Sequence, residues 1–443
     1  MSLALVAGRV LTALDPPRLV QADVLVEDGR IGSLGAAPAG VARRDCSGCL
    51  IIPGIVCGHT HIYSALARGM PYPLAPPVNF LQILQRVWWR LDRALDEETI
   101  RASALLGGMD ALLSGTTTLI DHHASPNAID GSLDVLADAF AQLGVRSVLC
   151  YEVTDRDGPE RARAGVAENR RFLRTGRPLA RGLTGAHASF TMSAETLAAC
   201  VDLARQSGTG IHIHVAEDLA DQADARARVG RRVVPRLAAA GALDERAILA
   251  HCVHVDDGEV AAIRESGAAV AHNARSNMNN AVGRAKVGAL GDRVILGTDG
   301  IGGDMFAEGQ AAYWRAREDD VSLSITWPME RLAHTARVAA RIFEEPLLGR
   351  IEPGAPADLA VLAYDPPSPL HDGNVAGHWV FGLSSRYVRD VLVAGELMVA
   401  DRRLTRVDQD SLVAQAAVQA ERLWRRLEEI GPHEFMPAGV ASG

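Results

Sequence analysis

The stretch Pro53-Gly54-Ile55-Val56-Cys57-Gly58-His59-Thr60-His61 combines a strand with a pair of metal-binding side chains. The apolar run from Leu50 to Val56 predicts a short buried strand. Two histidines separated by one residue end it, and side chains two residues apart in a strand share one face. Imidazole is the commonest metal-ligating side chain and suits zinc or iron. A His-x-His pair alone is a weak signal, so its meaning depends on the rest of the chain.

Strand-like and helical runs alternate after this stretch. Helix boundaries are marked by Gly144 as a C-terminal stop, Ser193 as a cap, and the capping-box pattern of Asp256 and Glu259. Eight β-then-α units over roughly 280 residues predict an α/β protein with a (β/α)8 TIM barrel. A doubly wound open sheet is the alternative. The expected strands are Ile55–His59, Thr117–His122, Arg146–Glu152, Arg181–Ala186, Gly210–Val215, Ala247–His251, Ala268–His272 and Val294–Gly297.

Both chain ends contain short β-like runs with hairpin turn signals, for example Glu27-Asp28-Gly29-Arg30. They predict one small β-sandwich domain that is assembled from the two ends. The expected division is residues 1–54 for the first part of the sandwich, 55–350 for the barrel, 351–408 for the second part, and 409–443 for a C-terminal helix and tail. The apolar stripe expected on that helix is Leu412, Ala416, Val418, Leu423 and Leu427.

Acidic and imidazole side chains recur where the expected strands end. His214 lies near the end of the fifth expected strand, with Glu217 just beyond it, His251 ends the sixth, and Asp299 follows the eighth. Functional groups of a barrel lie at these ends. One ion there meets three imidazoles and a carboxylate and keeps an open position, which a catalytic metal needs. Each single histidine is otherwise an ordinary polar group. A structural role beside the ligands is expected for His212, and pocket lining or hydrogen bonding for His122, His123, His254 and His272.

Composition excludes several classes of partner. The chain of 443 residues has a net charge of −9 and no basic tract, which argues against nucleic acid and anionic membranes. We find no signal peptide and no run of about 18 apolar residues that predicts a membrane span. Cys46 and Cys49 form an isolated Cys-x-x-Cys pair, which we interpret as thiols at a strand edge. A reduced cytoplasmic protein is expected.

The motifs Pro-Gly-x-x-x-x-His-x-His, His-x-x-Glu, the strand-six histidine and Gly-Thr-Asp-Gly together resemble the amidohydrolase superfamily. They are similar to its deaminase and chlorohydrolase branch, over nearly the whole chain. The resemblance implies metal ligation by His59, His61, His214 and Asp299. It implies Glu217 and His251 as the catalytic acid–base pair, with Asp299 as a second proton acceptor.

The same resemblance implies one divalent metal ion per chain, zinc before iron. Binuclear relatives bridge two metals with a carboxylated lysine after the fourth strand. The single lysine of this chain, Lys286, follows the seventh expected strand, and none stands in Arg181–Phe190. One ion is therefore expected.

Residues for substrate binding are also implied. His187, in Gly185–Phe190, matches the branch's strand-four histidine, which contacts substrate. Asn277 lies in Ser276–Gly283, a segment that resembles the SsnA-type aminohydrolases; the Asn-Pro that usually precedes it is replaced by Asn273-Ala274. Arg68 and Trp88 follow the first strand and could form a lid over an electron-rich ring. A plain helix packing face is an equal interpretation of Trp88 and Trp89.

Hydrolytic deamination of an amino-substituted nitrogen heterocycle, with release of ammonia, is the expected activity. The ring would be of the purine, pterin, pyrimidine or triazine type. The alternatives are hydrolysis of a cyclic amide, displacement of chloride or a thiol from a ring, and a metal-binding scaffold without activity. The expected partners are the small heterocyclic substrate and a second copy of the chain in a homodimer.

Overall fold

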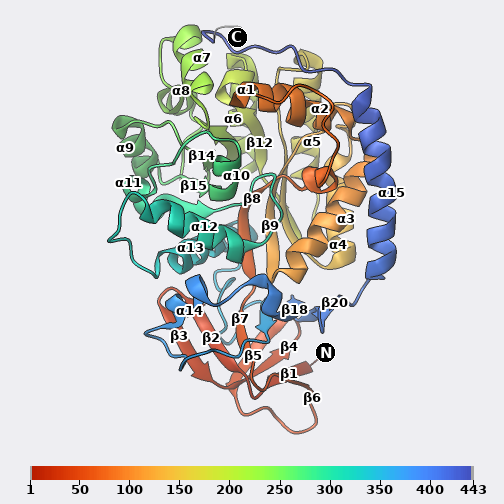
Figure 1. Ribbon diagram of the computed structural model, residues 1–443, viewed down its shortest axis with the longest axis vertical. Coiled ribbons are helices and arrows are strands. Elements are labelled where there is room, and N and C mark those ends of the chain that lie inside the picture. Colours follow the sequence, from red (N-terminus) through yellow and green to blue (C-terminus); the bar gives the residue numbers. More distant parts are fainter. Residues whose placement is uncertain (1, 441–443) are drawn as a thin grey trace.

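Two parallel β-sheets lie at the centre of the protein, whose structure is a computed structural model that describes residues 2–440 (Figure 1). Their orders are β11-β10-β9-β8 and β12-β13-β14-β15-β16. All but two of these strand residues are buried, as in parallel sheets that helices cover on both faces. The strands are β8 (Ile55–Thr60), β9 (Thr116–His123), β10 (Arg146–Tyr151), β11 (Ala180–Gly182), β12 (Thr184–Ala188), β13 (Ile211–Val215), β14 (Ile248–His251), β15 (Ala269–His272) and β16 (Val294–Leu296).

The fourth expected strand consists of two short ones, β11 and β12, on either side of Leu183. The Leu183 amide donates to the Leu149 carbonyl at 3.1 Å, and the next amide, of Thr184, donates to the Gly210 carbonyl at 3.1 Å. Consecutive amides of one extended chain point to opposite sides. The segment therefore bonds to one sheet and then to the other, and it is divided because its partner changes.

The outer edges of the two sheets also meet. Thr60 pairs in parallel with Asp299. The amides of Thr298 and Asp299 donate to the His59 carbonyl at 2.8 and 3.1 Å, and the His61 amide donates to the Asp299 carbonyl at 3.1 Å. The end of β8 and the segment after β16 are thus held together by backbone hydrogen bonds.

Helices separate the strands and pack around them (Figure 1). The predicted boundary signals are confirmed: Gly144 ends α4 with φ 82°, Ser193 caps α6, and Asp256 and Glu259 form a capping box on α9. Within residues 2–440 no helix has the length and apolar character to cross a bilayer. The principal helices are α3 (Glu97–Leu113), α4 (Ser132–Leu143), α5 (Pro159–Phe172), α6 (Ala194–Ser207), α7 (Leu219–Val229), α8 (Val233–Ala240), α9 (Asp257–Ser266), α10 (Ala274–Asn279), α12 (Met305–Arg317) and α13 (Trp327–Phe343).

Strands from both chain ends lie side by side below the parallel sheets (Figure 1). β7 pairs antiparallel with β17, with Ile52 opposite Ala360. Their sheets have the orders β5-β4-β1-β6 and β20-β19-β18-β17-β7-β2-β3. These strands are β1 (Ser2–Val6), β2 (Arg9–Leu14), β3 (Pro17–Gln21), β4 (Asp23–Glu27), β5 (Arg30–Gly35), β6 (Ala42–Asp45), β7 (Leu50–Pro53), β17 (Leu359–Leu362), β18 (Val388–Val393), β19 (Glu396–Ala400) and β20 (Arg403–Leu404).

The C-terminal helix α15 (Gln409–Glu428) runs along one side of the molecule (Figure 1). It buries Leu412, Ala416, Ala420, Leu423 and Leu427. The predicted stripe was wrong at Val418, which is 62% exposed, because Ala420 continues the i, i+4 row from Ala416. Beyond α15 the tail returns to the strand ends, where the His433 amide donates to the Gln85 carbonyl at 2.9 Å.

A buried ion pair joins the parallel strands to the sheet that contains β17. Arg146, which begins β10, donates to Asp358 from Nε at 2.8 Å and from Nη2 at 3.0 Å. The Asp358 carboxylate also accepts from the Ala394 amide at 2.7 Å. Because Arg146 and Asp358 are only 5% and 2% exposed, neither charge has water as an alternative partner.

Removing one partner of this pair should therefore be costly. Asp358→Ala is expected to lower the free energy of unfolding by about 3–5 kcal/mol, because it leaves the Arg146 charge buried and unpaired. Urea unfolding followed by circular dichroism measures the change. The control is Asp202→Ala, which removes a pair with Arg205 that is exposed on both sides and should leave stability nearly unchanged. Equal stability of both variants would contradict a linking role for the buried pair.

Candidate metal and catalytic site

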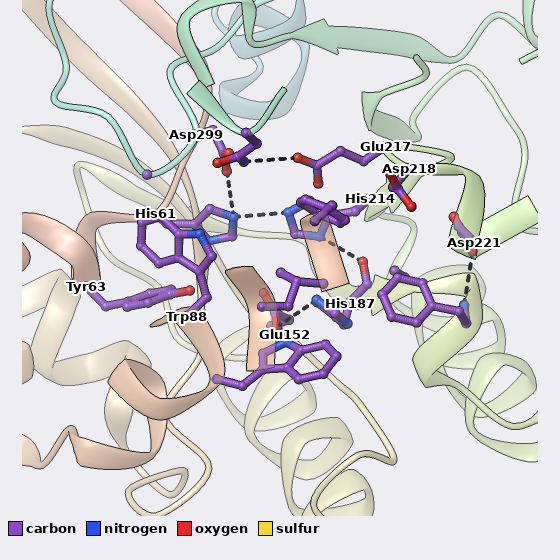
Figure 2. Close-up of a pocket in the computed structure, with 17 residues that line it drawn as sticks. His61, Tyr63, Trp88, Glu152, His187, His214, Glu217, Asp218, Asp221 and Asp299 are labelled. Carbon is purple, nitrogen blue, oxygen red and sulfur yellow. Dashed lines mark hydrogen bonds and ion pairs between the residues drawn. The ribbon is translucent and has the colours of Figure 1, made fainter. Parts of the chain in front are cut away.

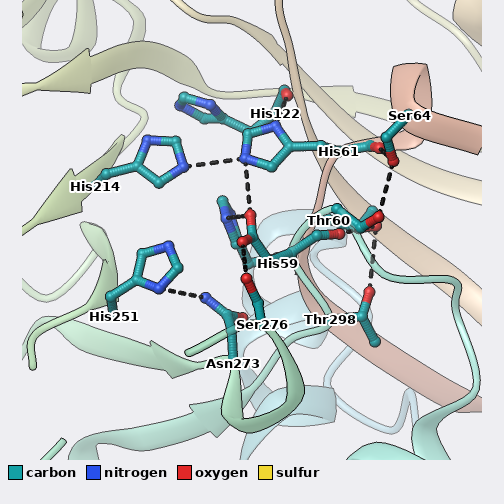
Figure 3. Close-up of polar contacts among 12 residues, drawn as sticks. His59, Thr60, His61, Ser64, His122, His214, His251, Asn273, Ser276 and Thr298 are labelled. Atoms are coloured by element: carbon teal, nitrogen blue, oxygen red, sulfur yellow. Dashed lines mark hydrogen bonds and ion pairs between the residues drawn. The ribbon is translucent and has the colours of Figure 1, made fainter. Parts of the chain in front are cut away.

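Imidazole rings from β8, β13 and β14 converge with Asp299 at the C-terminal ends of the parallel strands (Figure 3). His61 Nε2 lies 3.0 Å from His214 Nε2 and 3.1 Å from Asp299 Oδ1. His59 Nε2 lies 3.4 Å from the same carboxylate oxygen. Ligand atoms of His59, His214, His251 and Asp299 all lie within 4.8 Å of one another. The structure thus brings all the predicted ligands into one buried cluster.

The backbone turns sharply where these side chains emerge. His251 and Asp299 have φ angles of 73° and 53°, and Ala216, next to Glu217, has 47°. Non-glycine residues adopt this left-handed region rarely and at a cost of about 1–3 kcal/mol. Gly297 permits the close approach of β8, since a Cβ atom there would lie 2.8 Å from the His59 amide nitrogen. The strained backbone lowers the stability of the fold, and it directs these side chains into the cluster.

In His61, His214 and His251 the second ring nitrogen is held by a group that only accepts hydrogen bonds, whereas His59 Nδ1 lies 2.8 Å from a ring nitrogen of His212. His61 Nδ1 lies 2.6 Å from the His122 carbonyl, His214 Nδ1 lies 2.8 Å from the His187 carbonyl, and His251 Nδ1 lies 2.8 Å from Asn277 Oδ1. Each Nδ1 therefore carries the hydrogen, which leaves Nε2 of a neutral ring as a bare acceptor. Such fixing of the tautomer is typical of metal-ligating histidines.

These bare nitrogens fit a cation. The Nε2 atoms of His59 and His251 are buried and have no hydrogen-bond partner, and those of His61 and His214 face each other at 3.0 Å. Acceptors placed in this way repel unless a positive centre lies among them. The three imidazoles and one carboxylate match the donors that bind zinc in catalytic sites. The residues present thus fit a divalent metal ion.

Electrostatics point to the same demand for positive charge. Burial lowers the pKa of His59 to about 3. Burial also opposes the charged form of His61, but the Asp299 carboxylate outweighs it and raises the His61 pKa to about 9. Burial opposes the charge of Asp299 too, yet His59 and His61 hold its pKa well below the usual value. Either a proton on His61 or a cation among the rings neutralises the negative charge of Asp299.

Glu217 faces this cluster from the other side. Its Oε2 lies 3.4 Å from His251 Nε2, and its Oε1 accepts from Asn280 Nδ2 at 3.4 Å. Burial and then the Asp299 charge raise the pKa of Glu217 well above its ordinary value. The side chain is therefore suited to hold a proton beside the rings and to release it.

A pocket opens over the cluster (Figure 2). Trp88 and Trp89 stand on one side, and Trp88 packs over Gly300, directly after Asp299. The pocket combines apolar walls with a few convergent polar groups, as small-molecule sites do. Its lining comprises His61, Tyr63, Phe80, Leu84, Trp88, Trp89, Glu152, His187, Ala188, Phe190, His214, Glu217, Asp218, Asp221, Asn280, Asp299 and Gly300.

Two of the predicted substrate-binding residues, His187 and Trp88, line this pocket. Two others do not. The Arg68 side chain is 69% exposed and pairs with Asp110 at 2.5 Å, because it points away from the strand ends. Asn277 is buried and holds His251 instead of facing the pocket. Lys286 lies on the surface outside this pocket, where it pairs with Asp257 at 2.9 Å.

Sequence reasoning missed Glu152 and Asn280. Glu152 directly follows β10, so the strand-end rule that selected His214 and His251 would also have found it. Asn280 follows the short helix α10 and carries no such signal. Among the other histidines, His212 lies 2.8 Å from His59 Nδ1, and His254 lies 2.7 Å from the Val282 carbonyl. Both hold neighbouring groups, as expected.

Known proteins resemble the chain throughout its length. The family model described as "Amidohydrolase family" matches residues 50–398. A 5'-deoxyadenosine deaminase of Methanopyrus kandleri is 31% identical over 96% of this chain and 99% of its own. A 5-methylthioadenosine/S-adenosylhomocysteine deaminase of Nitratidesulfovibrio vulgaris is 32% identical over 93% of this chain and 95% of its own.

Solved structures show the same fold. An adenosine deaminase from Xanthomonas campestris with bound zinc superposes with a TM-score of 0.82, at 24% identity, over 97% of this chain and 99% of its own. An atrazine chlorohydrolase from Arthrobacter aurescens gives 0.81 at 23% identity, over 94% of this chain and 100% of its own. The family match covers most of the chain and the two curated relatives cover nearly all of it; the chain belongs to the amidohydrolase family.

Proposed function

We propose that this protein is a metal-dependent hydrolase that deaminates an amino-substituted nitrogen heterocycle, specifically an adenosine derivative, and releases ammonia. The convergence of bare imidazole nitrogens and Asp299 beneath Glu217 carries the proposal. The names of the two curated relatives support the purine ring. The pocket wall of Trp88 and Trp89 can stack on such a ring.

We assign the metal ligands to His59, His61, His214 and Asp299, with zinc preferred to iron because the donors are imidazoles and a carboxylate. When bound, such an ion acts as a Lewis acid and supplies a nucleophile at neutral pH by acidifying water. Asn277 orients His251, whose Nε2 faces the cluster and can hold the attacking oxygen. Asp299 can accept the proton that this oxygen loses.

Glu217 completes the reaction as the general acid. Its carboxyl group stands beside His251 and lines the pocket, where it can protonate the ring nitrogen next to the attacked carbon. A second proton transfer to the exocyclic nitrogen expels ammonia. Positioned acid–base groups contribute about 10²–10⁴-fold each. The Asn280 amide, which donates to Glu217, keeps the carboxyl group aimed at the pocket.

We further propose that residues 55–350 close into a (β/α)8 barrel, and that residues 1–54 and 351–408 form one β-sandwich domain, followed by the helix and tail of 409–443. Hydrogen bonds at both sheet edges and the pairing of β7 with β17 support this division. A homodimer and a cytoplasmic location stay predictions.

The first test is metal content and activity of the purified full-length protein. Elemental analysis after expression with added zinc should give about one ion per chain, since the four proposed ligands form one set around a single position. Ammonia release should follow with adenosine derivatives from a panel that also contains pterins, pyrimidines and triazines. A value near two ions, or chloride release from a chlorotriazine without any ammonia, would refute the corresponding part of the proposal.

Loss of a ligand should abolish both metal and turnover. His214→Ala and Asp299→Ala are each expected to lose the ion and to fold normally, because both side chains lie at strand ends outside the packed layers. Metal analysis and circular dichroism measure the two properties. His254→Ala is the matched control, because His254 follows β14 but bonds to the Val282 carbonyl, and it should keep the ion.

A separate variant tests whether Glu217 acts as the general acid without binding the metal. Glu217→Gln should keep the ion yet lower kcat by about 10²–10⁴-fold, or about 3–5 kcal/mol of barrier, because an amide cannot deliver the proton. Metal content is measured beside turnover in the same preparation. Loss of the ion would make Glu217 a ligand, and unchanged kcat would remove it from the reaction.

A further inference from the structure

One buried carboxylate of the pocket has no part in the proposed reaction. Glu152, directly after β10, is 3% exposed and lines the pocket beside His187 (Figure 2). A Glu152 carboxylate oxygen lies within 4.8 Å of ring nitrogens of His61 and His214. A substrate that reaches the proposed metal ligands must therefore also lie next to Glu152.

Glu152 is held rigidly from behind. Arg156 Nη1 donates to Glu152 Oε1 at 3.0 Å, and Glu152 Oε2 lies 3.2 Å from His122 Nδ1. Arg156 also pairs with Asp92 and lies 5.3 Å above the Trp89 ring. The side chains of Arg156 and Asp92 are each 1% exposed. A carboxylate fixed by buried charges in this way is pre-organised to meet a ligand.

His187 places a second acceptor beside this carboxylate. Its Nδ1 lies 2.6 Å from Thr191 Oγ1, and that hydroxyl donates to the Ala188 carbonyl at 3.2 Å. The Thr191 hydrogen is thus used, and His187 Nδ1 must donate to Thr191. His187 Nε2 is then a bare acceptor, 3.6 Å from Glu152 Oε1. The pocket offers two adjacent acceptors, and none of residues 2–440 places a donor between them.

The charge of the pocket wall adds a second condition. Among the described residues, the lining contains no lysine or arginine but does contain five acids, Glu152, Glu217, Asp218, Asp221 and Asp299. Glu217 adds no charge while it holds its proton, and a divalent cation offsets only part of the charge of the other four acids. Anionic groups brought into a desolvated acidic pocket are repelled, and like-charge contacts of this kind cost several kcal/mol.

We propose that Glu152, together with His187, is a specificity-determining residue that accepts a hydrogen bond from a donor group of the substrate, so that the enzyme selects neutral or cationic amino-heterocycles and rejects anionic ones. The inference rests on the proposed deaminase function and narrows its substrate class. The donor is either a ribose hydroxyl or the exocyclic amino group of the purine.

The test measures kcat/KM for ammonia release by the zinc-loaded full-length protein. Adenosine and 5'-methylthioadenosine are neutral, whereas adenosine 5'-monophosphate is anionic at the same end. We expect about 100-fold or greater preference for the neutral pair over the monophosphate. 5'-Methylthioadenosine controls for bulk, because it is also extended at the 5' position. A preference for the monophosphate would overturn the proposal.

Glu152→Gln tests the residue itself, because glutamine keeps the size and one acceptor but not the charge. We expect kcat/KM for the neutral substrates to fall about 10- to 100-fold, mostly through KM, and the preference over the monophosphate to shrink. A merely structural defect would lower kcat/KM equally for the neutral substrates and for the monophosphate. The control Glu168→Gln also removes a buried carboxylate that pairs with an arginine, but Glu168 bonds the Gly131 and Leu133 amides outside the pocket.

The control variant should keep the wild-type preference. An unchanged preference in Glu152→Gln, with normal metal content, would overturn the role of Glu152 while the deaminase function stands. No ammonia from any adenosine derivative would overturn the function and this inference with it. 2',3'-Dideoxyadenosine locates the donor: a loss of about tenfold or more assigns it to the 2'- or 3'-hydroxyl, and an unchanged rate, with 5'-methylthioadenosine lacking the 5'-hydroxyl, assigns it to the exocyclic amino group.

Discussion

The contacts of the Asp299 carboxylate with His59 and His61 are the interaction on which the rest of the site depends. The carboxylate lies within 3.4 Å of His59 Nε2 and 3.1 Å of His61 Nε2, in a place where water does not screen it. Its backbone is bonded to the end of β8, so the first and last parallel strands meet there. A buried negative charge surrounded by bare nitrogens is unstable without a cation. The fold therefore brings together groups that only a positive centre reconciles.

The residues around Asp299 show how the ring nitrogens are oriented toward a positive centre. Three rings of the cluster, those of His61, His214 and His251, are fixed by an acceptor on the far nitrogen, and two of these acceptors are backbone carbonyls of neighbouring strand-end residues. Left-handed backbone at His251 and Asp299 turns the side chains inward. Such strain persists only because the packed strands over-determine it. The site's precision thus comes from the strand ends rather than from mobile loops.

A second buried charge network lies beside the first. Arg156 is shared by Glu152 and Asp92, and burial raises the pKa of Asp92 to about 7 although the guanidinium opposes the shift. Buried ion networks seldom improve stability over apolar packing. This network lies at the pocket, where Glu152 faces a ligand and Trp89 stacks on Arg156. The network therefore serves to recognise the ligand.

Much of the local structure and of the candidate site could be predicted. Apolar runs of strand length and capping signals such as Ser193 and Asp256 were predicted correctly, because each depends on neighbours in the chain. The selected polar residues do lie at strand ends, and their roles stay predictions. Glu152 also lies at a strand end, but the role of Glu152 was not recognised from the sequence. Arg68 and Val418 were placed wrongly, since a side chain's direction on a loop or helix depends on what packs against it.

The sequence by itself determined the order of strands and helices, the recurrence of histidine and acid at strand ends, and the family. Only the tertiary structure decided which nitrogen of each ring is free, that Asn277 holds His251 while Asn280 reaches Glu217, and that Glu152 stands beside His187. The physical reason is that hydrogen bonds and charges act over a few ångströms in space. Residues distant in sequence meet there, and their spacing along the chain carries no record of that meeting.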